Sequence, residues 1–359
     1  MRVLLAGGGT GGHIYPLLAI AQASDWECSF VGTPAGLEAQ IVPRAGLPFY
    51  TVIAGGVRGK RPAQRLQGLW RTARGSLAAW RLLGRLRPDA VVSSGGYAAF
   101  PVALAARWRK VPLVLVEPNA TPGLANRILM GRADRILVGF DAARSKLPAP
   151  LQSRTAVTGV PARAFAPRER RAAREALGVP VGGVLIAVTG GSQGARALNR
   201  AVCGLAAQLG EGETVLLATG QREYDQWSGA AGERLRILPY FWQMDDVLAA
   251  ADLFIGRAGA MTCAELTIAG LPSVLVPLPN PAVRQIDNAR LLVDAGAALL
   301  LEEDDLTPEA LWQVLAPLVR DAALRGRMAD ASRALGRPDA AAAAVREVRR
   351  AVVGRSAKA

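Results

Sequence analysis

Glycines and one histidine follow the first apolar segment of this 359-residue chain. Residues 3–6 lead directly into Gly-Gly-Gly-Thr-Gly-Gly at residues 7–12, and His13, the only histidine, comes next. Glycines between a strand and a helix let backbone N–H groups approach a phosphate at the helix N-terminus. A histidine has no part in holding a phosphate, but it titrates near neutral pH and can accept a proton. The stretch therefore predicts a ligand-binding turn but leaves the task of the histidine at its rim open, and Pro16 predicts the start of the next helix.

The glycine spacing also matches the Gly-x-Gly-x-x-Gly turn of dinucleotide-binding domains, which needs an acidic residue about twenty residues further on. Here the second apolar run, residues 28–31, ends in Gly-Thr-Pro, and the acids Asp25 and Glu27 precede it. The Gly-Lys-Ser/Thr of an ATP-binding P-loop does not occur in the chain. A nicotinamide, flavin or P-loop enzyme is therefore disfavoured, and a tight turn without a ligand remains the simpler alternative.

Two further glycine turns follow apolar runs later in the chain. In residues 190–194, Ser192 and the backbone amides are placed to contact a diphosphate, or Ser192 caps the next helix. In residues 256–265, Thr262 and Glu265 form a capping-box pattern, or Glu265 accepts two hydrogen bonds from a ribose diol. Taken alone, this pattern favours the cap.

Amides, acids and thiols complete the polar inventory. Gln285 and Asn288 follow the next apolar run, where amide side chains suit the hydroxyls of a sugar. The acidic pairs at residues 245–246 and 304–305 lack the context of a metal site, and the three cysteines show no metal-ligand spacing. We therefore expect no metal and no cofactor, and free thiols in a reducing compartment.

Short runs rich in Val, Leu and Ile recur along the chain, each followed by glycine or proline and then by a helix-like segment. They cover residues 2–6, 28–32, 90–93, 113–117, 135–138, 155–158, 183–189, 214–218, 235–238, 252–256, 273–277 and 298–301. Continuous apolar strands that alternate with helices indicate parallel sheets covered on both faces. Two such sets predict two doubly wound α/β domains, joined near residues 158–167, with ligands at the carboxyl ends of the strands in a cleft between the domains.

Charge and composition narrow the class of partner. The chain carries 43 Lys and Arg against 29 Asp and Glu, a net charge of +14, which implies a phosphorylated substrate, an anionic lipid or nucleic acid. Its hydrophobic content of 51% is ample for packed cores. The first apolar run is too short for a signal peptide, and Gly, Ser or Pro interrupts the longest uncharged stretches. No membrane-spanning helix is therefore expected.

One segment concentrates this charge: residues 57–88 contain nine basic residues and no acid. Apolar residues recur within it at roughly helical spacing, namely Leu66, Leu69, Trp70, Leu77, Trp80 and Leu83. Tryptophan and arginine together on an amphipathic helix are typical of a peripheral contact with an anionic membrane. A helix that packs this stripe into its own domain, with a solvated basic face, and a nucleic-acid contact are the alternatives.

Seven motifs, in order along essentially the whole chain, resemble those of the MurG family of glycosyltransferases. They are Gly8-Gly-Thr-Gly-Gly-His13, Ser94-Gly-Gly-Tyr97, Glu117-Pro-Asn119, Gly159-Val-Pro-Ala-Arg163, Gly190-Gly-Ser-Gln-Gly-Ala-Arg196, Arg257-Ala-Gly-Ala-Met-Thr-Cys-Ala-Glu265 and Gln285-Ile-Asp-Asn-Ala289. The resemblance implies an α/β fold of GT-B type, with two Rossmann-like doubly wound domains facing a cleft. Residues 1–160 would form the acceptor and membrane side, with a C-terminal helix at about 339–356 packing back on it, and residues 161–338 would bind the UDP-sugar donor.

The resemblance also implies an activity, the inverting transfer of N-acetylglucosamine from UDP-N-acetylglucosamine to a lipid acceptor. That acceptor is undecaprenyl-diphospho-muramoyl-pentapeptide, glycosylated on its muramoyl 4-hydroxyl in the lipid I to lipid II step of peptidoglycan synthesis, which serves cell-wall biogenesis, cell shape and cell division. The protein would lie peripherally on the cytoplasmic face of the inner membrane, with no nucleic-acid partner. Donor contacts would fall on Thr10, Gly11, Gly12, Asn119, Arg163, Ser192, Phe241, Ala260, Met261, Thr262, Cys263, Ala264, Glu265 and Gln285. The ribose role of Glu265 thereby comes ahead of the cap.

Two departures from the family pattern bear on the mechanism. Val116-Glu-Pro-Asn119 stands where the family usually has His-Glu-Gln-Asn, and Arg284 stands where it usually has a histidine. His13 is then the only imidazole, and we expect it to be the catalytic base that deprotonates the acceptor hydroxyl, with Glu117 as the alternative. UDP is a good leaving group whose charge the helix N-termini after the second and third glycine turns would hold, so a second acid is not required.

Two rival functions remain open from the sequence. Another GT-B protein, such as a sugar-nucleotide epimerase or a glycolipid synthase, would bind the UDP-sugar yet fail with the muramoyl lipid. A nucleic-acid-binding module on the basic surface is disfavoured because aromatic stacking platforms and a recognised module are absent.

Overall fold

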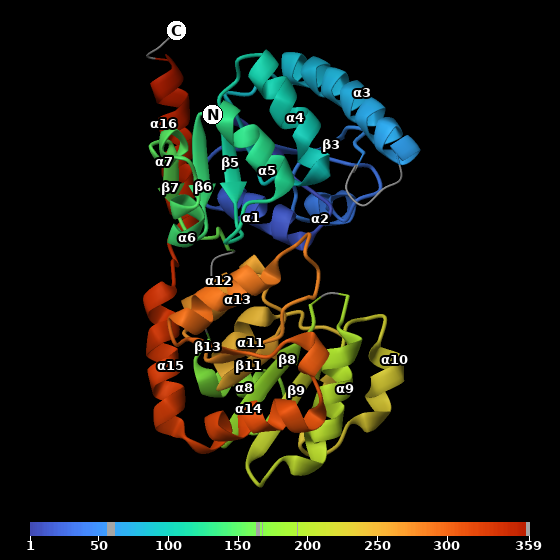
Figure 1. Ribbon diagram of the computed structural model, residues 1–359, viewed down its shortest axis with the longest axis vertical. Coiled ribbons are helices and arrows are strands. Elements are labelled where there is room, and N and C mark those ends of the chain that lie inside the picture. Colours follow the sequence, from blue (N-terminus) through green and yellow to red (C-terminus); the bar gives the residue numbers. More distant parts are fainter. Residues whose placement is uncertain (56–61, 163–165, 167, 192, 357–359) are drawn as a thin grey trace. The chain divides into compact units, whose positions relative to one another are not determined.

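The computed structural model describes the backbone of residues 1–55, 62–162, 166, 168–191 and 193–356 (Figure 1). The side chains of residues 62–66, 69 and 356 are outside this description. The chain divides into two compact units. Unit 1 consists of Met1–Ala164 with Pro338–Ala359, and unit 2 is Phe165–Arg337.

Unit 1 is built on a seven-stranded parallel sheet in the order β3-β2-β1-β4-β5-β6-β7. The strands are β1 (Arg2–Ala6), β2 (Glu27–Gly32), β3 (Phe49–Thr51), β4 (Ala90–Ser93), β5 (Leu113–Glu117), β6 (Arg135–Val138) and β7 (Thr155–Val157). The strand order reverses between β1 and β4, because β2 and β3 extend the sheet on one side of β1 and the later strands extend it on the other. Ligands of such sheets bind beyond the carboxyl ends of the strands at this reversal.

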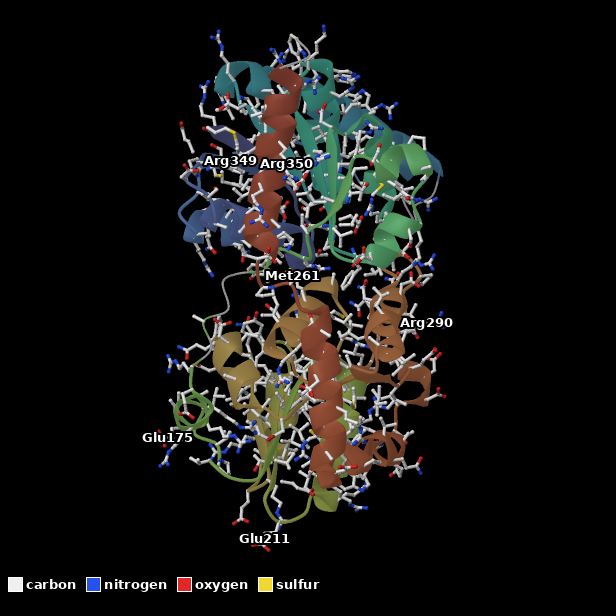
Figure 2. All side chains as sticks on the ribbon, turned by 90° about the vertical axis from the view of Figure 1, so that its left-hand side faces the viewer. Glu175, Glu211, Met261, Arg290, Arg349 and Arg350 are labelled. Carbon is white, nitrogen blue, oxygen red and sulfur yellow. The ribbon has the colours of Figure 1, made fainter. Side chains whose placement is uncertain are left out.

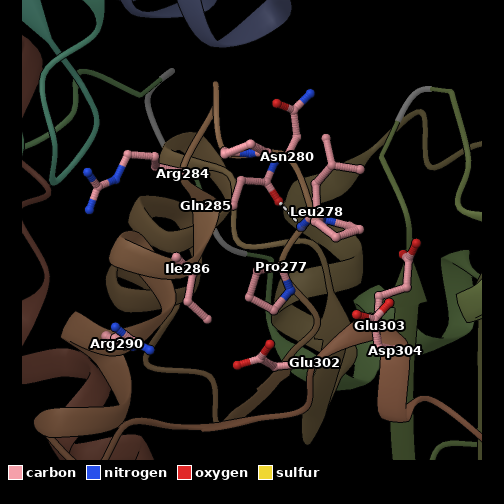
Figure 3. A pocket seen from close by; sticks show the side chains of 12 residues that line it. Pro277, Leu278, Asn280, Arg284, Gln285, Ile286, Arg290, Glu302, Glu303 and Asp304 are labelled. Atoms are coloured by element: carbon pink, nitrogen blue, oxygen red, sulfur yellow. Dashed lines mark hydrogen bonds between the residues drawn. The ribbon is translucent and has the colours of Figure 1, made fainter.

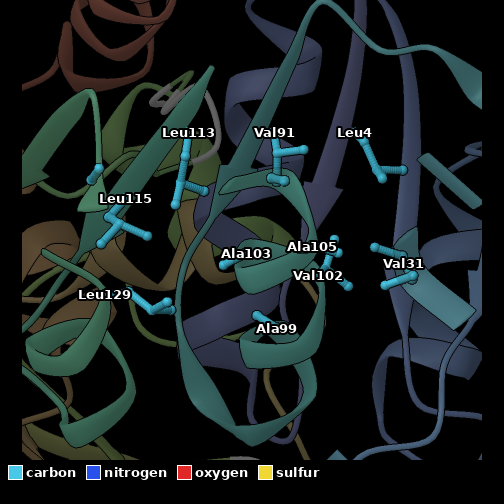
Figure 4. Close-up of a cluster of buried hydrophobic side chains, with 14 of the residues drawn as sticks. Leu4, Val31, Val91, Ala99, Val102, Ala103, Ala105, Leu113, Leu115 and Leu129 are labelled. Carbon is cyan, nitrogen blue, oxygen red and sulfur yellow. The ribbon is translucent and has the colours of Figure 1, made fainter. Parts of the chain in front are cut away.

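Helices cover both faces of this sheet. They are α1 (Gly11–Gln22), α2 (Glu38–Arg44), α3 (Pro62–Leu86), α4 (Gly96–Trp108), α5 (Leu124–Leu129), α6 (Asp141–Ser145), α7 (Ala149–Gln152) and α16 (Ala340–Ser356), with the 3₁₀ turn η1 (Met130–Arg132). Side chains alternate between faces along a strand. Val3 and Leu5 therefore pack with α1 and α16, whereas Leu4 packs with α3 and α4. Figure 4 shows the small side chains of α4 lying against the strands on this second face.

The C-terminal helix α16 belongs to unit 1 (Figure 2). Its apolar side packs into the core together with α1, and ion pairs connect its charged side chains to the rest of unit 1. Arg349 bonds Asp25 at 2.7 Å, and Arg355 bonds Asp134 at 2.8 Å. The end of the chain therefore returns to the sheet in which the chain began.

Unit 2 is built on a six-stranded parallel sheet in the order β10-β9-β8-β11-β12-β13. The strands are β8 (Val184–Thr189), β9 (Glu213–Ala218), β10 (Leu235–Leu238), β11 (Leu253–Gly256), β12 (Ser273–Leu275) and β13 (Ala298–Leu300). The helices are α8 (Arg170–Ala176), α9 (Arg196–Leu205), α10 (Tyr224–Trp227), α11 (Met244–Ala250), α12 (Ala260–Ala269), α13 (Gln285–Asp294), α14 (Pro308–Arg320) and α15 (Ala322–Leu335), with the 3₁₀ turns η2 (Ala206–Gln208), η3 (Ser228–Ala230) and η4 (Glu303–Asp305). Here the order reverses between β8 and β11.

The predicted doubly wound α/β architecture is confirmed, and each predicted apolar run carries a strand. Sequence reasoning missed β3, an edge strand of three residues directly after Pro48. Its side chains are half-buried or exposed, so it lacks the continuous apolar run by which the other strands were identified. In each unit the glycine turns follow the two strands that flank the reversal.

Candidate active site

The first glycine turn joins β1 to α1 at the carboxyl edge of unit 1. Helix α1 begins at Gly11, with Thr10 as the N-cap residue and no side-chain cap bond. The prediction that Pro16 starts this helix is wrong, because Pro16 lies inside α1. His13 is consequently in the first helical turn, where the partial positive charge of the helix end favours an imidazole without its second proton.

The ring of His13 lies against the glycine turn that follows β4. A Cβ atom on Gly96 would lie 3.3 Å from Cδ2 of His13 and 3.7 Å from Nε2, and the hydroxyl of Ser94 donates to the His13 carbonyl. Within the described part of the chain, Nδ1 of His13 is buried without a hydrogen-bond partner. Burial is the largest influence and lowers the pKa of His13 from its ordinary value of 6.5, while Glu117, the Ser94 backbone and Glu38 partly oppose it. The neutral form can accept a proton.

The turn after β4 has a shape that only glycines adopt readily. Gly95 and Gly96 have φ values of 84° and 78°, and Gly95 is the N-cap residue of α4. A Cβ atom on Gly95 would press on the side chain of Asn126. The ring of Tyr97 lies over Gly9, at 3.3 Å from where a Cβ would be. The N-termini of α1 and α4 thus lie next to each other, at the strand reversal where ligands of this fold bind.

Glu117 ends β5 and is buried, with both carboxylate oxygens engaged. Oε1 accepts from the backbone N–H and the side-chain amide of Asn119, at 3.0 and 3.1 Å. Oε2 accepts from the N–H of Gly123 at 2.8 Å and from the amide of Asn126 at 3.0 Å. The carboxylate therefore anchors the loop between β5 and α5, and four donors already occupy its oxygens.

In unit 2 two glycine turns flank the reversal between β8 and β11. Gly194 has a φ of 78° and packs against the carbonyl of Thr219, where a Cβ has no room. Helix α9 follows, with Ala195 as its N-cap residue. Of the residues expected here to contact the donor, Ser192 lies outside the described residues, as does Arg163 in the segment joining the units.

The turn after β11 shows that the capping-box interpretation of Glu265 is wrong. Helix α12 begins at Ala260 with Gly259 as its N-cap residue, so Thr262 is the third helical residue and cannot be the cap. Glu265 lies one turn further on, partly buried and in contact with a polar partner. Cys263 faces the core, where burial raises the pKa of its thiol to about 12. Residues 260–265 therefore form the first turn and a half of a helix whose N-terminus has no side-chain cap.

A pocket of about 420 Å³ lies beyond β12 and β13 in unit 2 (Figure 3). It is lined by Gln285, Arg284, Asn280, Glu302 and neighbouring residues. The side-chain oxygen of Gln285 accepts from the N–H of Leu278 at 2.9 Å, which orients its amide. Arg284 pairs with Asp287 at 2.7 Å and has a φ of 54°. Phe241 is buried, in the loop after β10.

Within the described ranges, no three His, Cys, Asp or Glu side chains are placed to hold a metal ion. Among the helices described, none is long and apolar enough to cross a membrane.

Helix α3 divides the apolar stripe of the basic segment between two environments. Leu83 is buried in the core of unit 1, whereas Trp70, Leu77 and Trp80 are 59%, 49% and 39% exposed. The side chains of Leu66 and Leu69 lie outside the description. Arg74 stacks over the Trp70 ring at 4.6 Å, and Arg109 of the segment after α4 stacks over Trp80 at 3.8 Å.

Sequence reasoning missed Trp108, which is 56% exposed at the end of α4, the neighbour of α3. Trp108 is a lone aromatic residue between basic residues, and it lies outside the basic segment of residues 57–88. Exposed tryptophan, leucine and arginine side chains together make this helical face suited to an anionic interface.

Comparison with known proteins identifies the family. Residues 3–138 match the glycosyltransferase family 28 N-terminal domain, and residues 185–344 match the glycosyltransferase family 28 C-terminal domain. The UDP-N-acetylglucosamine–N-acetylmuramyl-(pentapeptide) pyrophosphoryl-undecaprenol N-acetylglucosamine transferase of Salinibacter ruber is 43% identical, over 97% of this chain and 96% of its own. The enzyme of the same name from Symbiobacterium thermophilum is 42% identical, over 99% and 96%.

A solved structure agrees with these relatives. The crystal structure of Acinetobacter baumannii MurG is 30% identical, covers 97% of this chain and 99% of its own, and superposes with a TM-score of 0.78. The two Rossmann-like units are those of a GT-B glycosyltransferase. The chain belongs to the MurG family of UDP-N-acetylglucosamine-dependent glycosyltransferases.

Proposed function

We propose that this protein transfers N-acetylglucosamine from UDP-N-acetylglucosamine to the 4-hydroxyl of the muramoyl sugar of undecaprenyl-diphospho-muramoyl-pentapeptide, which converts lipid I to lipid II. The observation that carries the proposal is identity of 43% over 97% of the chain with a relative named for this transfer. The neutral histidine in the first turn of α1 supplies the proton acceptor that the reaction requires.

The transfer needs one base and a site for the leaving group. His13 takes the proton of the acceptor hydroxyl while the hydroxyl oxygen forms a bond to the anomeric carbon of N-acetylglucosamine. The bond from that carbon to UDP breaks, and UDP departs from the opposite face of the sugar. The charge developing on the diphosphate is stabilised by the N-termini of α9 and α12, because free backbone N–H groups and the helix dipole both favour an anion. Glu265 holds the ribose diol, and Gln285 contacts the sugar. Thr10, Gly11, Gly12 and Asn119 complete the contacts from unit 1.

A transfer assay with labelled UDP-N-acetylglucosamine and a short-chain lipid I analogue tests the function. We expect a disaccharide product only when the acceptor is present. An epimerase would convert the UDP-sugar without any acceptor, and a glycolipid synthase would reject the muramoyl analogue; either result would overturn the proposal.

Replacing Glu265 by glutamine is expected to weaken UDP-N-acetylglucosamine binding by about 1.5–3 kcal/mol, because a hydrogen bond to a charged group is lost. Titration calorimetry with UDP-N-acetylglucosamine, and competition with UDP, measure the change. Glu175→Gln, on the exposed side of α8, is the matched control and should bind normally. Unchanged affinity with unchanged stability would remove Glu265 from the donor site, and unchanged affinity with lowered stability would make its role structural.

For the location of the protein, we propose a peripheral contact of α3 and the end of α4 with the cytoplasmic face of the inner membrane. Exposed Trp70, Leu77, Trp80 and Trp108 would enter the interface, while the arginines around them meet anionic headgroups. Tryptophan rings stacked under arginine side chains present both groups on one face. The lipid anchor of the proposed acceptor requires such a position.

Replacing Trp70, Trp80, Arg74 and Arg81 together should lower binding to anionic vesicles at least tenfold, since each basic residue near the surface contributes about 1 kcal/mol. The binding that remains should depend less on salt. Vesicle sedimentation checks this, with Arg200→Gln and Arg320→Gln in unit 2 as the charge-matched control. Transfer to a short-chain acceptor should survive. Equal partition of variant and parent would refute the membrane contact.

A further inference from the structure

A buried carboxylate outside the predicted site holds the first glycine turn in place. Glu38 is the first residue of α2 and is completely buried. One oxygen accepts from the backbone N–H of Thr33 at 2.9 Å and from its hydroxyl at 2.8 Å. The other accepts from the N–H of Gly9 at 2.9 Å. Glu38 thereby ties the turn after β1 to the end of the neighbouring strand β2.

Several glycines around this carboxylate are explained by its presence. A Cβ atom on Gly8, Gly32 or Gly36 would overlap the Glu38 side chain. At Gly8, inside the turn that precedes His13, the space where a side chain would lie is therefore occupied by the Glu38 carboxylate. A ligand could approach the glycine turn only from the side that faces away from Glu38.

The charge of Glu38 also reaches His13. Burial favours protonation of Glu38, but the hydrogen bonds from Thr33, from Gly9 and from its own N–H together hold its pKa below the usual range. His13 is thus influenced by two carboxylates, Glu117 at the end of β5 and Glu38 at the start of α2, besides the backbone of Ser94 after β4. Each carboxylate favours the imidazolium that forms when His13 accepts a proton.

We propose that Glu38 is a positioning residue of the transfer reaction: its carboxylate fixes the Gly8–Gly9 turn so that His13 meets the acceptor hydroxyl, and its charge stabilises the imidazolium. This inference rests on the proposed function for the identity of the reaction. Glu38 has no contact with substrate, because it is enclosed by the turn that it holds. A misplacement of about 1 Å in such a turn costs about 10²-fold in rate.

The single histidine allows a test that needs no substrate. In the untagged protein, the imidazole signals of His13 are titrated by NMR in the parent and in Glu38→Gln, which keeps the side-chain shape and removes the charge. The midpoint should move to lower pH, because one of two nearby negative charges is lost. Asp134→Asn is the matched control. Asp134 accepts hydrogen bonds from the N–H of Leu113 and from Arg355 at the opposite edge of the sheet, so removing its charge should leave the His13 midpoint unchanged. An unmoved midpoint in Glu38→Gln would overturn the proposal.

Transfer kinetics give the second test. Glu38→Gln should lower kcat ten- to a hundredfold, while the Kd for UDP-N-acetylglucosamine changes less than about threefold because unit 2 holds most of the donor. Should that variant fail to fold, Thr33→Val removes only the hydroxyl donor and should lower kcat two- to fivefold. Normal kcat in a folded variant would overturn the positioning role. Failure of the parent to use the lipid acceptor would instead reject the proposed function and leave the NMR result standing.

Discussion

Replacing His13 by alanine is expected to lower kcat by about 10²–10⁴, the usual contribution of a general base. His13 lies in the first turn of α1 beside Gly96, and burial keeps its pKa below 6.5. The neutral base therefore persists to lower pH than an ordinary histidine. Activity of the parent should fall only as the pH drops through that lowered pKa. Donor affinity should change little, because most of the proposed donor contacts lie in unit 2.

Steady-state kinetics across pH, with both substrates saturating, measure this effect. Tyr15→Phe is the control, since Tyr15 is exposed on the same helix two residues further on. If His13→Ala keeps activity within about tenfold of the parent while Glu117→Gln, still folded, loses more, the base is Glu117 and His13 only shapes the turn.

Replacing Glu117 by alanine is expected to lower the free energy of unfolding of unit 1 by about 3 kcal/mol or more. The buried amide of Asn126 and the partly buried donors of Asn119 and Gly123 lose their acceptor, and an unsatisfied buried group costs about 1–3 kcal/mol. Urea denaturation followed by circular dichroism measures the change. Because the loop after β5 would move, kcat should fall as well.

A conservative variant separates the two possible roles of Glu117. Glu117→Gln keeps one acceptor oxygen and should lie between the parent and Glu117→Ala in stability. If the alanine variant unfolds at the same urea concentration as the parent yet loses activity, Glu117 acts on the reaction itself and its four hydrogen bonds are secondary.

The sequence alone predicted the parallel sheets and the positions of the glycine turns. Continuous apolar runs such as residues 113–116 are typical of a strand covered on both faces, so local composition indicates the architecture directly. Helix starts were less certain from sequence. Pro16 is typical of the first helical position and Thr262 of an N-cap, but both lie inside helices that begin earlier, at Gly11 and Ala260. Such signals describe a preference, and the geometry of the turn before the helix decides where the first turn forms.

Other features exist only in the folded chain. Nothing in the sequence distinguishes Glu38 from other acids, and the glycine turn at residues 7–12 predicted only a ligand site. Parallel pairing of β1 with β2 brings the ends of these strands together and closes three glycines around one carboxylate. Likewise, the stripe on α3 is split because Leu83 faces the core while Trp70 and Trp80 face outward. Composition and spacing determine which helices and strands form. Which side chains become buried partners depends on contacts between segments far apart in the sequence, and no local sequence pattern encodes those contacts.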